Sequence, residues 1–278
     1  MKGGAASSGM DASRGLGIRM GIFKLTGAAA PRGGVRRKLR VALYGCVAGA
    51  LLLGTAQAVA GTVVTDAVFS RSTQDQHDVA VTFGQVFKEG DVPRGATLAA
   101  TLNGQPVTLQ VNPKATNPDG SLRHAVLTAM VPSLPAGARL PLTLYTGAAL
   151  TGPTIGLSQL LATGYDARIS LNIGGTLYTA SARSLLQAAS LANACAAWDP
   201  QCNVWLSGPL ASEWVVNGPV TAANGTSPNL RVYFAVRAYS NGTPGAIGRV
   251  RTDIIVENTD AFAPQAQPQY TATLTSGT

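Results

Sequence analysis

Charged side chains are scarce in this sequence. They make up 12% of its 278 residues, about half of the roughly 25% that is usual in soluble domains. The chain also has only two histidines and three cysteines. No Gly-x-Ser-x-Gly turn is present and no glycine-rich phosphate loop precedes a helical segment, so hydrolase triads and nucleotide chemistry are disfavoured. We expect no cofactor, no metal ion and no catalytic residue.

Acidic residues are absent from one region in particular. The whole chain carries a net charge of +8 and has a pI near 9.8, which by itself would suggest a nucleic-acid partner. Residues 1–60, however, hold nine of the 21 basic side chains and one of the 13 acidic ones. The remaining 218 residues are balanced, with 12 of each sign. The basic excess therefore belongs to the N-terminal segment, and we expect no nucleic-acid partner.

That N-terminal segment has the pattern of an export signal. A basic cluster at residues 36–40 precedes an uncharged stretch at residues 41–60, and Ala58 and Ala60 supply small residues where a signal peptidase cuts. We predict cleavage near residue 60 and a periplasmic or extracellular protein. The alternative is an anchor formed by residues 41–60, which are long enough to span a bilayer. The start codon stays open among Met1, Met10 and Met20.

Two cysteines remain after this processing, Cys195 and Cys202. An exported chain favours their pairing, and the Asp199-Pro200 step between them favours a turn that brings them together. We predict a disulfide. A metal site would need more ligands nearby, and the spacing is too wide for the Cys-x-x-Cys redox pattern.

The rest of the chain alternates like a β protein. Residues 78–83, 121–131, 140–144, 167–173, 230–240, 249–258 and 270–275 read as strands. Apolar residues on both faces of 121–131 suggest a strand covered on two sides, as in a barrel or sandwich. One helix is predicted over residues 182–193, with Ser181 as its N-cap. We place modules at 61–150 and 151–278. Because no closing element follows the last strand, we expect the second module to continue beyond residue 278.

A hairpin is predicted over residues 96–111. Asn103-Gly104 suits a two-residue type I′ turn, since both positions need positive φ. Pairing outward from that turn sets Ala100 opposite Val107, Leu98 opposite Leu109 and Ala96 opposite Val111. All six side chains then share one face.

Three segments resemble a known family: residues 79–93 (VAVTFGQVFKEGDVP), 117–127 (NPDGSLRHAVL) and 250–258 (VRTDIIVEN). The first two are similar to the N-terminal RIFT-barrel-like β module of exo-acting rhamnogalacturonan lyase-like proteins. Related segments occur in phage virion-associated proteins. Such lyases carry catalysis in a helical domain, which these 278 residues do not contain, and His124 stands where the family usually has an aromatic residue. The resemblance therefore implies a β module tied to pectin-type polysaccharide and transfers no catalytic role.

Several side chains are candidates for contacting such a ligand. Tryptophans 198 and 205 could stack on sugar rings, or could instead fill a core around the disulfide together with Trp214. Arginines can bind uronate carboxylates, but Asp253 and Glu257 on the same sheet face argue for cross-strand ion pairs. His124 could be a ligand contact or a core histidine, and Asp75, His77 and Asp78 are more typical of a solvated loop than of a metal site. The candidate ligand-binding residues are Trp198, Trp205, Arg123, His124, Arg231, Tyr233 and Arg237.

The sequence thus predicts a mostly β protein of antiparallel barrel- or sandwich-like modules with one short helix, behind an N-terminal signal segment. Its predicted function is non-catalytic binding or scaffolding of acidic polysaccharide, as part of or derived from a larger lyase. The alternatives are a cell-surface or virion-type structural protein and a polysaccharide lyase. A membrane is expected as a partner only through an uncleaved signal segment, and the oligomeric state stays open.

Overall fold

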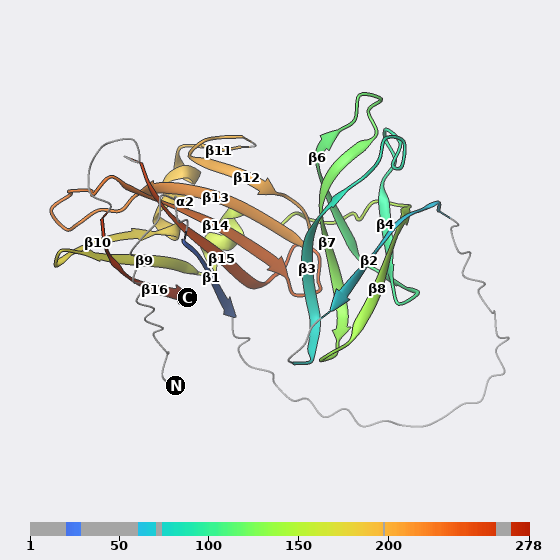
Figure 1. The fold of residues 1–278 in the computed structure, drawn as a ribbon, viewed down its shortest axis with the longest axis horizontal. Helices are drawn as coiled ribbons and strands as arrows, with labels where there is room; N and C mark the ends of the chain where they lie inside the picture. Colours follow the sequence, from blue (N-terminus) through green and yellow to red (C-terminus); the bar gives the residue numbers. More distant parts are fainter. Residues whose placement is uncertain (1–20, 29–60, 71–73, 197, 260–267) are drawn as a thin grey trace, which may run out of the picture.

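The computed structural model describes residues 21–28, 61–70, 74–196, 198–259 and 268–278; within 21–28 it describes the backbone only. The fold is mostly β, and its strands pair almost entirely antiparallel, as predicted. Two bodies lie side by side in Figure 1: an upright barrel-like module and a broad sheet that extends away from it. Among the described helices, none is long and apolar enough to cross a membrane. The predicted signal stretch and its cleavage positions, Ala58 and Ala60, lie outside the described residues.

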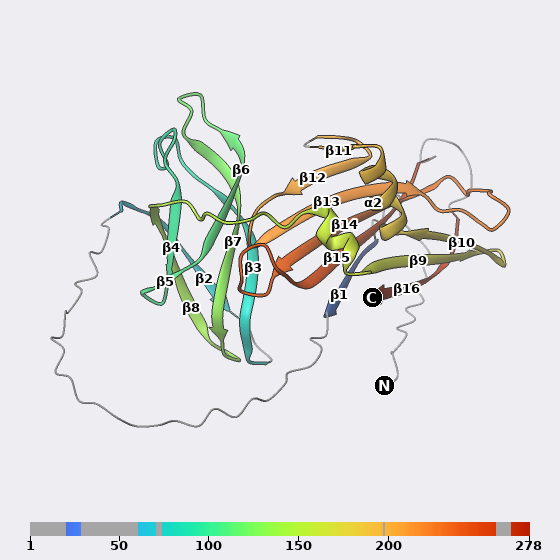
Figure 2. The ribbon, with the colours of Figure 1, turned by 180° about the vertical axis from the view of Figure 1, so that it is seen from behind.

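The first module is built from two sheets around one core. One sheet has the order β2-β8-β4-β5 and the other the order β3-β7-β6. Figure 2 shows the two sheets from behind, wrapped around a common interior. The strands are β2 (Val63–Ser70), β3 (Gln76–Val86), β4 (Leu98–Leu102), β5 (Gln105–Val107), β6 (Leu109–Thr116), β7 (Leu122–Leu134) and β8 (Arg139–Thr146).

Strand β7 is covered on both faces, as its sequence predicts. Seven consecutive residues, from Ala125 to Val131, are buried. Leu127 and its neighbours at alternate positions face the barrel core. Val126 and Met130 face the other way, into a separate cluster with residues of the second module. One strand therefore serves two cores.

The predicted hairpin is correct near its turn and wrong farther out. Ala100 does pair with Val107 across the Asn103-Gly104 turn, and both turn residues have positive φ. Beyond Val107, however, the chain crosses to the other sheet, so that Leu109 pairs with Ala129 of β7. Leu98 pairs instead with Thr146 of β8. Five of the six residues still share a core because the two sheets face each other, whereas Ala96 is exposed ahead of β4. The apolar pattern alone could not separate a flat hairpin from a barrel corner.

The second module packs a long sheet against a short one. The long sheet has the order β1-β15-β14-β13-β12-β11, and the short sheet has the order β10-β9-β16. The elements are β1 (Gly21–Ala28), α1 (Leu157–Ala162), β9 (Asp166–Ile173), β10 (Thr176–Ser181), α2 (Ala182–Leu191), β11 (Cys195–Ala196), β12 (Cys202–Leu206), β13 (Ala211–Pro219), β14 (Leu230–Ser240), β15 (Ile247–Asn258) and β16 (Thr271–Gly277).

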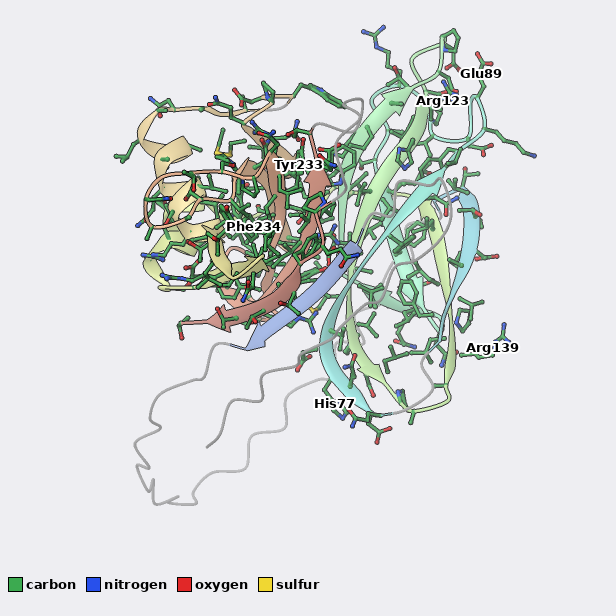
Figure 3. All side chains as sticks on the ribbon, turned by 60° about the vertical axis from the view of Figure 1, so that its left-hand side comes forward. His77, Glu89, Arg123, Arg139, Tyr233 and Phe234 are labelled. Carbon is green, nitrogen blue, oxygen red and sulfur yellow. A yellow bond between two sulfur atoms is a disulfide. The ribbon has the colours of Figure 1, made fainter. Side chains whose placement is uncertain are left out.

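The core of this module lies between the two sheets. Phe234 at its centre is fully buried, and Figure 3 shows it inside the module. Helix α2 contributes Leu186 and Ala189 to this core, and Ser181 caps it by accepting a hydrogen bond from the Ser184 amide at 3.0 Å. The structure adds a second, six-residue helix, α1, where the sequence predicts only one helix. Its single turn and a half is too short to give a clear apolar period.

A polar seam joins the two modules. Along β6, alternate side chains bond to the backbone of residues 205–211. Gln110 accepts hydrogen bonds from the amides of Leu210 and Ala211 at 2.7 and 2.9 Å. Asn112 donates to the Ser207 carbonyl at 2.8 Å, and Lys114 donates to the Trp205 carbonyl. Because side chains alternate along a strand, one face of β6 makes all of these contacts.

Candidate functional site

The predicted disulfide between Cys195 and Cys202 is confirmed, with Cα atoms 4.7 Å apart. It ties the short strands β11 and β12 together in parallel register. Asp199 shapes the loop between them, because its Oδ1 accepts hydrogen bonds from the amides of Gln201 and Cys202 at 2.7 and 3.0 Å. The loop is thus closed covalently and braced internally.

Trp198 stands on this closed loop and points into solvent. The residue is 76% exposed, and its backbone has φ of 68°, a conformation that is uncommon for a bulky non-glycine residue. Its ring meets that of Trp205 edge to face, with centroids 6.5 Å apart. Trp214, in contrast, is buried in the core beside Cys202. The three tryptophans therefore differ in burial: Trp198 is exposed, Trp205 is half-buried against the cluster shared by the two modules, and Trp214 is in the core.

Lys114 completes a cluster that the sequence did not indicate. It comes from β6 of the first module, and its Nζ lies 4.0 Å from the centroid of the Trp205 ring. Partial burial lowers the pKa of Lys114 below its ordinary value of 10.5, with the negative charge of Glu213 acting in the opposite direction. We call Trp198, Trp205 and Lys114 the Trp/Lys cluster. In it the cation lies over the face of Trp205, and Trp198 meets Trp205 edge to face.

The alternation Gln110, Asn112, Lys114 was the only sequence signal that could have pointed to this contact. It places three polar residues on one face of a strand whose other face is partly apolar. The partner residues lie some 90 positions later in the chain, so no local pattern could name them.

The predicted arginines of β14 are already engaged. Arg237 binds Glu213 through Nε and Nη2 at 2.9 and 2.7 Å. Glu213 is only 3% exposed; burial raises its pKa, while the charge of Arg237 acts to lower it. Arg231 donates to the side chain of Asn217. Partial burial raises the pKa of the Tyr233 hydroxyl, and Figure 3 shows this residue on the sheet of the second module.

The neighbouring strand β15 repeats this behaviour. Arg251 and Asp253, two positions apart on β15, form an ion pair at 2.7 Å. Arg249 lies over the ring of Tyr239, 5.0 Å from its centroid, and donates to the Ala80 carbonyl of the first module at 3.3 Å. The expectation of cross-strand ion pairs to Asp253 and Glu257 is wrong in its partners. Asp253 pairs with Arg251 of its own strand, and the cross-strand pair is formed by Arg237 and Glu213.

The remaining predicted ligand contacts, Arg123 and His124, lie at the start of β7. Arg123 is exposed at one end of the first module (Figure 3). His124 is half-buried, and the strand register sets it opposite Ala115, beside the bulged Lys114. A Cβ at Gly84 would come within 3.2 Å of the His124 Nε2, so the glycine of the TFG segment makes room for this ring.

The segments that carry the family resemblance hold each other in place. Asp119 accepts hydrogen bonds from the amide and the hydroxyl of Ser121 at 2.8 and 2.6 Å. Ser121 Oγ in turn accepts from the Gly90 amide at 3.0 Å, and the Leu122 amide donates to the Val92 carbonyl at 2.9 Å. These hydrogen bonds join the 90–92 segment to the 119–122 segment at one end of the barrel, and we call this contact the latch.

A cleft of about 610 Å³ lies between the modules, next to this latch. Its walls come from the 92–98 and 149–154 segments, β6 and Ser207–Pro209, and its lining includes no aromatic side chain and no carboxylate. Arg94 is its one charged lining residue. Without an aromatic face, this cleft suits a sugar ring less well than the Trp/Lys cluster does.

No group of three or more potential metal ligands occurs in the described part of the chain. The expected solvated loop at Asp75, His77 and Asp78 is wrong for the last two, which lie in β3. Asp75 accepts a hydrogen bond from the Ala136 amide at 2.8 Å. His77 lies at the end of the first module opposite Glu89 and Arg123 (Figure 3).

Comparison with known families decides what the first module is. Residues 69–137 match the PcRGLX-like N-terminal RIFT barrel domain. This RIFT barrel domain runs from Phe69 in β2 to Gly137 before β8, and it confirms the resemblance carried by the two N-terminal segments. No curated protein and no solved structure matches the chain. Most of the Trp/Lys cluster lies beyond the matched range, because only Lys114 belongs to the RIFT barrel domain.

Proposed function

We propose that the exported chain binds acidic, pectin-type polysaccharide through the Trp/Lys cluster and does not cleave it. The observation that carries the proposal is the cluster itself, which joins the exposed Trp198 and the half-buried Trp205 of the second module to a cation from the RIFT barrel domain. The membership of that domain in a rhamnogalacturonan lyase-like family supports a pectin-related ligand.

The chemistry of the cluster fits a uronic-acid sugar. The C–H-rich face of a sugar ring can lie on an indole, which offers a large apolar surface with a negative π face. The Lys114 ammonium beside Trp205 would attract a carboxylate on the same or the next sugar. The disulfide closes the loop that carries Trp198, which reduces the backbone ordering that ligand binding would require.

Binding without cleavage is favoured by the state of the nearby arginines. A lyase must neutralise the uronate carboxylate and place a base at the adjacent carbon. Arg237 and Arg251 are held by Glu213 and Asp253. The lowered pKa of Lys114 is the one feature that favours the lyase alternative, because a lysine with a lowered pKa can act as a base.

The test measures affinity for de-esterified pectic fragments by calorimetry on the purified exported protein. Trp198→Ala, Trp205→Ala and Lys114→Ala should each weaken binding by about ten-fold, equivalent to about 1.4 kcal/mol. Tyr270→Ala and Arg139→Ala, which remove an exposed aromatic and an exposed cation elsewhere, are matched controls and should bind like the unaltered protein. A neutral glucan should not bind.

Two results would contradict this proposal. Equal affinity in all five variants would show that the Trp/Lys cluster does not contact the ligand. A rise in ultraviolet absorbance from unsaturated uronate, lost in Lys114→Ala and retained in Arg139→Ala, would make the protein a lyase.

A further inference from the structure

Strand β1 occupies the outer edge of the long sheet. It pairs with β15 over eight residues, from Gly21 opposite Val256 to Ala28 opposite Arg249. Figure 3 shows this strand along the near edge of the second module. With β1 in place, β15 is an interior strand. Without it, the row of N–H and C=O groups on the outer side of β15 has no partner strand.

Export and this pairing exclude each other, and here the inference rests on the export that we propose. Residues 21–28 precede the predicted signal stretch at 41–60. During export the N-terminal side of a signal segment stays on the inner side of the membrane, and cleavage near residue 60 separates it from the rest. Residues 61–278 therefore fold on the other side with β15 as an edge strand. Such an edge is a template for pairing with another strand.

The outward-facing charges of β15 fit a second copy of the same strand. Antiparallel pairing about a two-fold axis at Thr252 sets Arg251 of each copy opposite Asp253 of the other and sets Val250 opposite Ile254. Directly opposite residues of an antiparallel pair share a face, so polar residues meet polar ones and apolar residues meet apolar ones. An axis at Asp253 would oppose two carboxylates, and an axis at Arg251 would oppose two guanidinium groups.

We propose that the exported protein forms a symmetric dimer through antiparallel β15–β15 pairing centred on Thr252. The two sheets then join into one continuous sheet across the axis, with the Trp/Lys cluster of each copy at the far side of its own sheet, beyond β13. Within one copy Arg251 and Asp253 already face each other at 2.7 Å, with side chains 28% and 20% exposed. Both charges are thus present on the face where the dimer needs them.

Charge reversal tests this register. The full chain is exported from a bacterial host, its N-terminus is verified by mass spectrometry, and its mass in solution is measured by analytical ultracentrifugation. Arg251→Asp alone opposes carboxylates in the dimer and Asp253→Arg alone opposes guanidinium groups, so each variant should dimerise at least about ten-fold more weakly. Mixing the two variants should restore a dimer, because each Asp then meets an Arg. The double variant R251D/D253R should dimerise alone.

Restored dimerisation on mixing also shows that the single variants are folded. A monomeric exported protein at micromolar concentration overturns the proposal, and so does a dimer that either single variant leaves unchanged. Pectic-fragment binding, measured on the same samples, separates the two proposals: the β15 variants should bind as the unaltered protein does, whereas Trp205→Ala should still dimerise. A purified protein that retains residues 21–28 removes the premise and overturns the dimer.

Discussion

The two modules of this chain differ in what holds them together. The first module, which contains the RIFT barrel match, closes two small sheets around a hydrophobic core that includes β7, Phe69 and Phe87. The second module adds to its core a disulfide and all three of the ion pairs formed within the described residues. All three tryptophans also lie there. The family match thus lies in the first module, which has none of these features among its described residues. Most of the candidate binding residues lie in the second module.

Their junction shows how a plain scaffold can still shape a site. The RIFT barrel domain contributes one cation, Lys114, and the strand face that holds residues 205–211 in place. The candidate site is therefore a property of the pair of modules, and the pairing itself can be tested by perturbing each side and then the seam.

The largest expected effects come from emptying the two cores. Phe234→Ala should lower the free energy of unfolding by about 3–5 kcal/mol and Leu127→Ala by about 2–5 kcal/mol, because each removes a fully buried side chain. Tryptophan fluorescence reports the second module alone, whereas far-ultraviolet circular dichroism reports both. Because the seam couples the modules, urea midpoints from the two probes should coincide in both variants. Different fluorescence and dichroism midpoints in the unaltered protein would contradict coupled unfolding of the two modules.

A smaller effect is expected at the seam. Gln110→Leu leaves the amides of Leu210 and Ala211 without their acceptor, which should cost about 1–3 kcal/mol. The fluorescence and dichroism midpoints should then separate, since the modules lose their main polar link. Gln85→Leu is the matched control, because the Gln85 amide bonds only the neighbouring Val86 carbonyl. Equal shifts in the two variants would mean that the seam does not couple the modules.

The smallest effect is one of pH on ligand binding. Lys114 attracts a carboxylate only when protonated, and its pKa lies below 10.5. At pH values where the uronates are ionised, affinity for acidic fragments should be constant below the pKa of Lys114 and should fall as the pH rises through it. Lys114→Arg should keep its affinity to higher pH, because a guanidinium stays charged. Calorimetry measures these affinities across the pH range, and Lys88→Arg, the control, should follow the profile of the unaltered protein. A Lys114→Arg profile that matched that of the unaltered protein would contradict a role for Lys114.

Sequence reasoning succeeded where the signal was local. The strand alternation of 230–240, the Ser181 cap and the Cys195–Cys202 pair each depend on residues close together in the chain, and each is present in the structure. The hairpin failed beyond Val107 because the crossover to a second sheet keeps the same apolar period. Trp198 and Trp214 carry the same residue type, and only the surrounding packing decides which one is buried.

The candidate site was only half foreseen for the same reason. Trp198 and Trp205 stood out beside a cysteine pair, but Lys114 is an ordinary strand residue until the modules dock. The pairing of β14 arginines was expected with acids on β15, yet Arg237 selects Glu213 on β13. Charge complementarity is visible in a sequence, whereas the strand that supplies the complement depends on topology.

Strand β7 has a consequence for how such a module can be inherited. Its two faces pack against different neighbours: Leu127 faces the barrel core, and Val126 and Met130 face the second module. If the RIFT barrel domain were moved alone into another protein, those two side chains would form part of an exposed apolar patch. A one-residue slip along β7 would exchange the faces and disturb both cores at once. We therefore expect related proteins to retain this barrel together with a module that covers Val126 and Met130. Substitutions at Val126 should covary with substitutions at Leu206 and Leu210.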